Sequence, residues 1–230
     1  MIHIGDTYGK IYDDIKFYNK YRKFKKETKI IFNNPKDCKE TIERREYENY
    51  EKFIPKQGDI VYDIGAGIGD YSLIWGNYYD AYVIAFEPLL SKYSEMLINF
   101  ELNDANYIER YNYLIGDGNP MAIYDNSKMI NNLGNGNKYV KDTVSIDNFL
   151  LENDLEDKPN IVKIDTEGFE KIILEGMRKT LANYKPKIII ETHSIDLLWS
   201  CHKLLIEYKY ELFKSQINGK DTFELFYEVV

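Results

Sequence analysis

The stretch DIGAGIGDYS, residues 63–72, follows the apolar run of residues 60–62 and precedes a predicted helix at residues 71–79. It contains three glycines at alternate positions: Gly65, Gly67 and Gly69. Glycine has no Cβ, so the backbone can turn sharply there and approach a ligand closely. The free N–H groups at the start of the following helix can also bind that ligand. The stretch therefore predicts a strand, a turn that holds a nucleotide-like ligand, and a helix.

Apolar strands alternate with helices after this point. The predicted strands occupy residues 60–64, 82–86, 107–115, 161–164 and 187–190. Helices with one apolar face are predicted at residues 89–100, 169–181 and 195–208. The segments YELFKS and TFELFYE flank Asn218-Gly219, which predicts an antiparallel hairpin, and residues 118–141 predict a loop or a hairpin. This order predicts an α/β fold with a mostly parallel sheet and an antiparallel C-terminal hairpin.

The N-terminal region differs from the rest of the chain in charge. Residues 10–29 hold eight Lys or Arg against three acidic residues, a charge of +5, so the rest must carry −13 to give the overall −8. Residues 37–52 predict a charged helix. We expect residues 1–57 to form an N-terminal arm and helix that can act as a substrate or cap region, and residues 58–230 to form the main domain. The basic arm could contact phosphates or acidic glycans, or be a solvated helical face.

Length and composition favour one α/β domain that lies outside membranes. The chain has 230 residues, of which 44% are hydrophobic, enough for a packed core. Cys38 and Cys201 form no metal-binding or redox motif, which fits a reducing compartment. The chain opens on no secretory pattern and contains no apolar run of membrane-spanning length. We therefore expect a cytoplasmic protein.

The spacing of the glycines differs from the pattern that binds dinucleotide cofactors. Dinucleotide-binding proteins use G-x-G-x-x-G, whereas this chain has G-x-G-x-G with Asp63 two positions before the first glycine. Glu87 follows the second strand, where a carboxylate can accept hydrogen bonds from both ribose hydroxyls of a dinucleotide or of another nucleoside cofactor. The alternative for Glu87 is a surface residue before a proline. Asp117, after the third strand, could meet an adenine amino group or be a simple turn residue.

The chain resembles the FkbM-type methyltransferases that depend on S-adenosylmethionine (SAM). The similarity covers about residues 58–195 and rests on DIGAGIGDYS (63–72), VIAFEP (83–88), VSIDNFL (144–150), VKIDTEGFEKIILEGM (162–177) and IIIETH (188–193). The resemblance implies a Rossmann-like class I methyltransferase fold with a seven-stranded sheet. It also implies methyl transfer, most often to a hydroxyl of a sugar, glycan or natural product. Ile68 departs from the pattern, because many relatives carry Asn there, which affects a side-chain contact to the methionine part of SAM.

The predicted cofactor-binding residues come from the matching motifs and from the turn after the third strand. They are Asp63, Gly65, Ala66, Gly67, Gly69, Tyr71, Ser72, Glu87, Pro88 and Asp117. In open α/β sheets the ligand lies beyond the carboxyl ends of the strands, where the strand order reverses. We therefore expect residues 63–69 and 165–168 to face one crevice, with Glu191 and His193 beside them.

His193 is the first candidate for the general base, because an imidazole has an ordinary pKa of about 6.5. Asp165 and Glu167 could orient His193, bind substrate hydroxyls or act as the base. Lys163 could pair with a carboxylate or bind the acceptor. The alternative is a structural ion network in which His193 caps the following helix. Asp165, Glu167, Glu191 and His193 could also bind Mg²⁺, but no spacing requires it, so the sequence predicts no metal.

The leading hypothesis is a SAM-dependent O-methyltransferase acting on a saccharide, glycan or small-molecule hydroxyl. An RNA methyltransferase that grips phosphates with its basic N-terminal arm is a second hypothesis, against which the overall acidic charge counts. A non-catalytic SAM-binding protein is a third. An NAD enzyme is a fourth, which the absence of G-x-G-x-x-G disfavours.

Overall fold

A seven-stranded sheet forms the centre of the protein. The computed structural model describes residues 4–105, 107–125, 137–153, 158–217 and 221–229. The strands of the main sheet, in spatial order, are β10 (Tyr210–Ile217), β11 (Phe223–Val229), β9 (Lys187–Thr192), β8 (Ile161–Ile164), β1 (Ile60–Ile64), β2 (Tyr82–Phe86) and β3 (Ile108–Tyr111). The strands from β9 to β3 are parallel, and β11 is antiparallel to both of its neighbours. The predicted α/β fold with an antiparallel C-terminal hairpin is confirmed.

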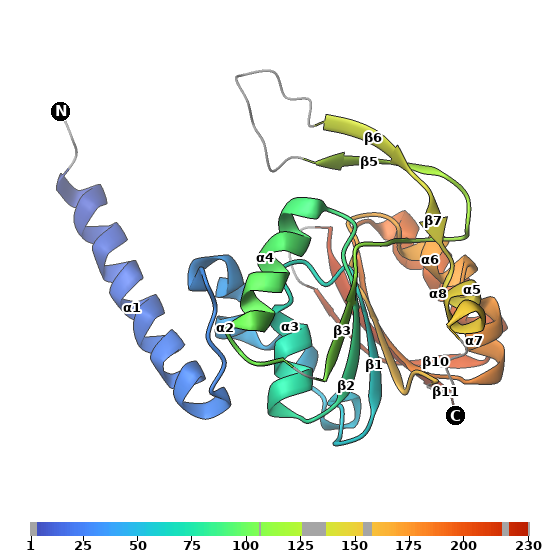
Figure 1. Ribbon diagram of the computed structural model, residues 1–230, viewed down its shortest axis with the longest axis horizontal. Coiled ribbons are helices and arrows are strands. Elements are labelled where there is room, and N and C mark those ends of the chain that lie inside the picture. The colour runs from blue at the N-terminus through green and yellow to red at the C-terminus, as the bar shows by residue number, and fades with distance from the viewer. Residues whose placement is uncertain (1–3, 106, 126–136, 154–157, 218–220, 230) are drawn as a thin grey trace.

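Helices cover both faces of this sheet (Figure 1). On one face lie α3 (Asp70–Leu73), the π-helical turn η4 (Ile74–Tyr78) and α4 (Leu90–Glu101). On the other lie α5 (Ile146–Glu152), α6 (Glu170–Glu175), α7 (Arg178–Asn183) and α8 (Ile195–Glu207). Successive strand residues point to opposite faces of the sheet. Val61 therefore packs into the core under α3 and α4, and Tyr62 into the core under α5 to α8. Strands buried on both faces explain the continuous apolar runs in the sequence.

The N-terminal region packs against the first face. It comprises α1 (Ile4–Thr28), η1 (Pro35–Cys38), α2 (Lys39–Arg44), η2 (Glu46–Glu48) and η3 (Glu51–Phe53). Phe24, Ile42 and Phe53 of this region belong to the same buried core as Val61. Side chains from the N-terminal region can therefore reach the sheet.

Two predicted elements differ from the structure. The single helix predicted at residues 37–52 is divided into short pieces, because Arg45 adopts a left-handed conformation with φ of 50°. The third strand, predicted at residues 107–115, leaves the main sheet after Tyr111. The Glu87 N–H donates the last bond of the ladder, to the carbonyl of Tyr111. The next donor, the Leu89 N–H, bonds to the Glu87 carboxylate, and the Glu87 carbonyl accepts from the Asn112 side chain, so the ladder ends there. The chain then forms β4 (Leu114–Ile115), which pairs with β7 (Thr143–Val144) in a separate small sheet.

Residues 118–141 contain an antiparallel hairpin, β5 (Met121–Asp125) and β6 (Asn137–Lys141), which projects from the body in Figure 1. A loop or hairpin was expected there. The predicted turn at Asn218-Gly219 lies outside the described residues. No helix among the described residues has the length and apolar character needed to cross a membrane.

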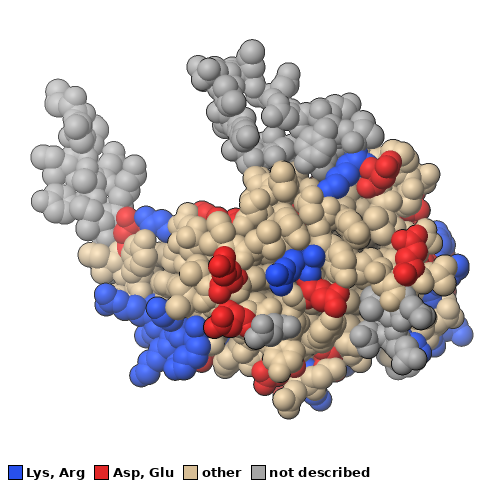
Figure 2. Space-filling view, in the orientation of Figure 1, with Lys and Arg blue, Asp and Glu red and all other residues tan. Residues whose placement is uncertain are grey.

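Basic side chains gather on part of α1. Figure 2 shows Lys and Arg over the end of the molecule where α1 lies, and Lys25 and Lys26 occupy the last turn of that helix. The view also shows acidic side chains spread over the body. The charge difference between the N-terminal region and the rest of the sequence therefore also separates two parts of the surface.

Candidate active site

The glycine turn lies at the reversal of strand order, because β1 pairs with β2 on one side and with β8 on the other. The N–H groups of Gly65 and Ala66 donate to the carbonyl of Phe86, at 3.0 and 2.9 Å. A Cβ at Gly65 would lie 1.9 Å from the carbonyl oxygen of Asp165, so only glycine fits there. A Cβ at Gly67 would meet no atom within 4 Å. The turn is thus packed against β8 at Gly65 and open at Gly67.

Glu87 borders the open side of the turn, as the sequence predicted. Its two carboxylate oxygens accept hydrogen bonds from the N–H groups of Gly67 and Leu89, at 2.9 and 2.8 Å. Burial raises the pKa of Glu87, while these N–H groups oppose the rise. Each carboxylate oxygen keeps a further lone pair that can accept from another donor. Two backbone N–H groups therefore fix the Glu87 carboxylate at the border of the turn.

Asp63 and Lys163 form a buried ion pair beneath the turn. Lys163 Nζ lies 3.0 Å from Asp63 Oδ1 and donates to the carbonyl of Gly65 at 2.8 Å. Ser72 Oγ donates to Asp63 Oδ2 at 2.6 Å. Burial lowers the pKa of Lys163, but the charges of Asp63 and Asp165 outweigh it and hold that pKa above its usual range. These contacts place Asp63, Ser72 and Lys163 inside the protein as supports of the turn.

The other predicted cofactor residues have different surroundings. Tyr71 and Ala66 are buried, and the Tyr71 ring packs against Tyr47 with centroids 4.5 Å apart. The carbonyl of Pro88 accepts from Asn112 and Lys141. Asp117 is exposed and accepts from the backbone and side chain of Asn119, at 3.0 and 2.9 Å. Its contact to adenine therefore stays a prediction.

A polar cluster lies beside the turn, at the carboxyl ends of β8 and β9. One ligand atom from each of Asp165, Glu191 and His193 lies within 4.8 Å of the others. His193 Nε2 lies 3.7 Å from Asp165 Oδ1 and 3.6 Å from the exposed Glu167 Oε2. The parallel register of β8 and β9 brings these groups together, as the sequence predicted. The other His residues are not in this cluster: His202 on α8 is hydrogen-bonded to the Tyr227 hydroxyl on β11, and His3 lies outside the described residues.

Two buried residues that the sequence analysis did not select hold this cluster. The Tyr47 hydroxyl lies 3.1 Å from Asp165 Oδ2 and 2.9 Å from Glu191 Oε2, and its one proton is shared between these two carboxylates. Glu170 Oε1 is hydrogen-bonded to His193 Nδ1 at 2.9 Å. Glu170 belongs to the KIDTEGFE segment, so the motif offered a signal for it. Tyr47 lies in η2, and no motif points to it.

Burial and neighbouring carboxylates raise the pKa values of titratable groups in and beside the cluster. Burial disfavours a charged His193, but the hydrogen bond to Glu170 and the charges of Asp165 and Glu167 outweigh it and raise the pKa to about 9. Burial and the charge of Asp165 raise the pKa of Glu191 to about 7. Burial, with Glu46 and Glu191, raises the pKa of Glu224 to about 8. At pH 7 His193 is therefore mainly an imidazolium, which donates protons and must lose one before it can act as a base.

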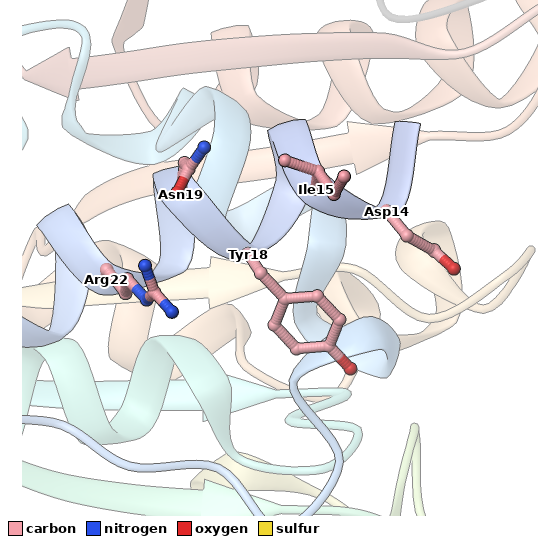
Figure 3. A pocket seen from close by; sticks show the side chains of 5 residues that line it. All are labelled: Asp14, Ile15, Tyr18, Asn19 and Arg22. Atoms are coloured by element: carbon pink, nitrogen blue, oxygen red, sulfur yellow. The ribbon is translucent and has the colours of Figure 1, made fainter. Parts of the chain in front are cut away.

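A second surface feature lies away from the cluster. A hollow of about 360 Å³ on α1 is lined by Asp14, Ile15, Tyr18, Asn19 and Arg22. Figure 3 shows these side chains on neighbouring turns of the one helix. Because all of them come from α1, the hollow contains none of the residues of the glycine turn or the polar cluster.

Comparison with known proteins decides the family. The model of the FkbM methyltransferase domain matches residues 63–210, which include the glycine turn, Glu87 and the polar cluster. The chain belongs to the FkbM methyltransferase family. It is 29% identical over 175 residues to the hexuronic acid methyltransferase AglP of Haloferax volcanii, covering 73% of this chain and 70% of that protein.

Two solved structures resemble the fold of this methyltransferase. The FkbM methyltransferase of Methylobacillus flagellatus KT matches with a TM-score of 0.55 and 18% identity, over 94% of this chain and 60% of that chain. The precorrin-6y C5,15-methyltransferase of Geobacter metallireducens GS-15 matches with a TM-score of 0.50 and 13% identity, over 80% of this chain and 90% of that chain. The Rossmann-like methyltransferase fold predicted from the sequence is confirmed.

Proposed function

We propose that this methyltransferase uses SAM to methylate an oxygen of a sugar or glycan. The observation that carries the proposal is the adjacency of two half-sites, where Gly65 packs against the carbonyl of Asp165 and the side chain of Asp165 enters the polar cluster. One half has the features of a nucleoside site, and the other has groups that bind hydroxyls and accept protons. Methyl transfer needs both halves in contact.

The first half fits SAM. The open space at Gly67 admits a ligand close to the backbone, and Glu87 at its border can accept from ribose hydroxyls. Gly65, Gly67 and Glu87 would hold the nucleoside, while Asp63, Ser72 and Lys163 keep the turn in shape. When bound, SAM supplies a methyl group on a positively charged sulfur, which leaves as the neutral thioether of S-adenosylhomocysteine.

The second half suits a hydroxyl acceptor. A hydroxyl must lose its proton as its oxygen forms the new bond to carbon, and a base within reach takes that proton. Glu167 is exposed at the edge of the cluster, 3.6 Å from His193, where its carboxylate can take that proton. In this proposal Asp165 and His193 align the acceptor oxygen. The role of His193 as the base stays a prediction. Its pKa of about 9 keeps the ring mainly protonated at pH 7, and a protonated ring cannot accept a proton.

Two observations support a sugar acceptor. The cluster presents several carboxylates, which are strong hydrogen-bond acceptors for the hydroxyls that line a sugar ring. The relative AglP is a hexuronic acid methyltransferase and shares 29% identity over most of both chains. A polyhydroxyl acceptor satisfies more of the carboxylate lone pairs than an apolar one can.

The test is transfer of labelled methyl from SAM to extract of the source cells, followed by separate digestion with glycosidases, nuclease and protease. We expect the protein to label material that glycosidases release. If nuclease releases the label instead, the acceptor is RNA rather than a sugar, and the basic side chains of α1 would bind its phosphates. Calorimetry with S-adenosylhomocysteine and NAD⁺ tests the cofactor, and binding of NAD⁺ alone would overturn the proposal.

Replacing Glu87 by alanine should weaken S-adenosylhomocysteine binding about tenfold or more, because the ribose hydroxyls lose the charged carboxylate to which they donate. Calorimetry measures the change. Glu101→Ala is the matched control, since Glu101 is an exposed carboxylate at the end of the neighbouring helix α4. Equal affinities in Glu87→Ala and the parent protein would remove Glu87 from the cofactor site.

A further inference from the structure

We propose that Asp165, Glu191 and His193 bind a divalent cation of the Mg²⁺ or Mn²⁺ type. The sequence did not require a metal, because these residues lie on two different strands with no diagnostic spacing. The fold brings one ligand atom from each within 4.8 Å of the others. The role of the cation in binding the acceptor rests on the proposed function, whereas the binding of the cation itself does not.

The distances suit a small ion. Around an octahedral Mg²⁺ with bonds of about 2.1 Å, neighbouring ligand atoms lie roughly 3–4 Å apart. His193 Nε2 and Asp165 Oδ1 are already 3.7 Å apart, too far for a hydrogen bond between them. An inward shift of under about 1 Å brings all three atoms to such a separation. Two carboxylate oxygens and one imidazole nitrogen form a hard donor set, which suits Mg²⁺ and Mn²⁺.

Buried partners hold Asp165 and His193 through the atom that the metal would not use, and also contact Glu191. The Tyr47 hydroxyl shares its one proton between Asp165 Oδ2 and Glu191 Oε2, which leaves Asp165 Oδ1 facing His193. Glu170 binds His193 Nδ1, which directs Nε2 toward Asp165. Metal-binding histidines commonly bond a carboxylate through their other nitrogen, and ligating carboxylates are commonly hydrogen-bonded in the same way. This arrangement is independent of the proximity of the three ligands.

A buried atom adds a second observation. Glu170 is fully buried, and its Oε2 has no hydrogen-bond partner among the described residues, while its Oε1 reaches into the cluster. Lys163 is shared between carboxylates, because its Nζ lies 3.0 Å from Asp63 Oδ1 and 3.9 Å from Asp165 Oδ2. A dication bound at His193 Nε2 takes the place of the proton of that ring and supplies the positive charge among these carboxylates.

Three protein ligands leave further coordination positions open. Open positions are typical of catalytic sites rather than structural ones, where the protein fills the coordination shell. Two neighbouring oxygens of a sugar can take them, and a bound cation lowers the pKa of a coordinated hydroxyl. The cation therefore positions the acceptor, and Glu167 remains outside the ligand set to take the proton.

The experiment titrates the full chain, after chelator treatment and desalting, with Mn²⁺. Binding is measured as the loss of the electron paramagnetic resonance signal of free Mn²⁺. We expect one Mn²⁺ per chain, displaced by Mg²⁺. Asp165→Asn, Glu191→Gln and His193→Gln should each weaken binding at least tenfold. Asp196→Asn, an exposed carboxylate at the start of α8, is the matched control and should bind as the parent does.

Tyr47→Phe tests the second layer of the site. It removes only the hydroxyl, so we expect the ring packing and the fold to be kept and Mn²⁺ binding to weaken about 10–100-fold. Circular dichroism and thermal unfolding confirm that each variant is folded. If any ligand variant does not fold, Tyr47→Phe and the remaining ligand variants decide the question.

The proposal is overturned if the parent chain binds no Mn²⁺, or if all ligand variants bind it as tightly as Asp196→Asn does. Calorimetry with S-adenosylhomocysteine in EDTA separates this failure from failure of the proposed function. Cofactor binding and methyl transfer that persist in EDTA, without Mn²⁺ binding, would remove the metal and leave the methyltransferase proposal standing. Mn²⁺ binding without cofactor binding would remove the methyltransferase proposal and leave the metal site standing.

Discussion

Gly65→Ala should unfold more easily than the parent chain by about 3 kcal/mol or more and should lose cofactor binding. The added Cβ would lie 1.9 Å from the carbonyl oxygen of Asp165 and 2.8 Å from Thr166 Cγ2. The carbonyl of Asp165 is backbone, and the Asp165 N–H is bonded to Ile64 at 3.1 Å, so neither side can move away cheaply. The φ of 78° at Gly65 adds strain for any residue with a Cβ.

Denaturant unfolding and calorimetry with S-adenosylhomocysteine measure the two effects. Gly58→Ala is the matched control, because Gly58 has a similar φ of 86° but a Cβ there would meet no atom within 4 Å. It should show the cost of the backbone conformation alone. Gly67→Ala should remain folded and lose cofactor affinity, because its Cβ enters the open space of the turn. A stable Gly65→Ala with normal binding would contradict the close packing of the turn on β8.

Lys163→Met should lower the free energy of unfolding by about 3–5 kcal/mol. Lys163 and Asp63 are both buried, and removal of the lysine leaves the Asp63 carboxylate inside the protein without its counter-ion. The variant also loses the bond to the Gly65 carbonyl, so the glycine turn loses a support. Denaturant unfolding at pH 7 measures the change.

Two further variants show whether the ion pair itself is responsible. Lys171→Met breaks the exposed pair of Lys171 and Glu175, 3.6 Å apart on α6, and should cost less than about 0.5 kcal/mol. The double variant Asp63→Asn with Lys163→Met buries no uncompensated charge. It should therefore be more stable than Lys163→Met alone. A double variant less stable than Lys163→Met would show that the pair contributes more than mutual charge compensation.

The glycine turn and the strand order were predictable because they depend on local chemistry. Alternating glycines after an apolar strand admit few backbone conformations, and apolar runs separated by amphipathic helices favour a parallel sheet. The positions of Asp165 and His193 then followed from the rule that strand ends meet at one edge of the sheet. The helix predicted at residues 37–52 was wrong, because the left-handed conformation of Arg45 has no signal in composition.

The roles inside the cluster were not predictable in the same way. Alternation along β8 placed Lys163 and Asp165 on one side, but only the neighbouring strand β1 shows that Lys163 pairs with Asp63. The basicity of His193 depends on Glu170, which is buried and bonded to it across 23 positions of sequence. Burial and hydrogen bonding set the charge of a group, and neither is a property of a single segment.

The sequence by itself determined the α/β fold, the glycine turn with Glu87 at its border, and the set of polar residues at the strand ends, because each depends on residue types close together in the chain. The tertiary structure alone decided that Tyr47, 118 positions from Asp165, joins Asp165 and Glu191. It also decided that Lys163 serves the turn, and that three ligand atoms converge beside it. Contacts between distant segments arise from packing of the whole core, and no local pattern encodes them.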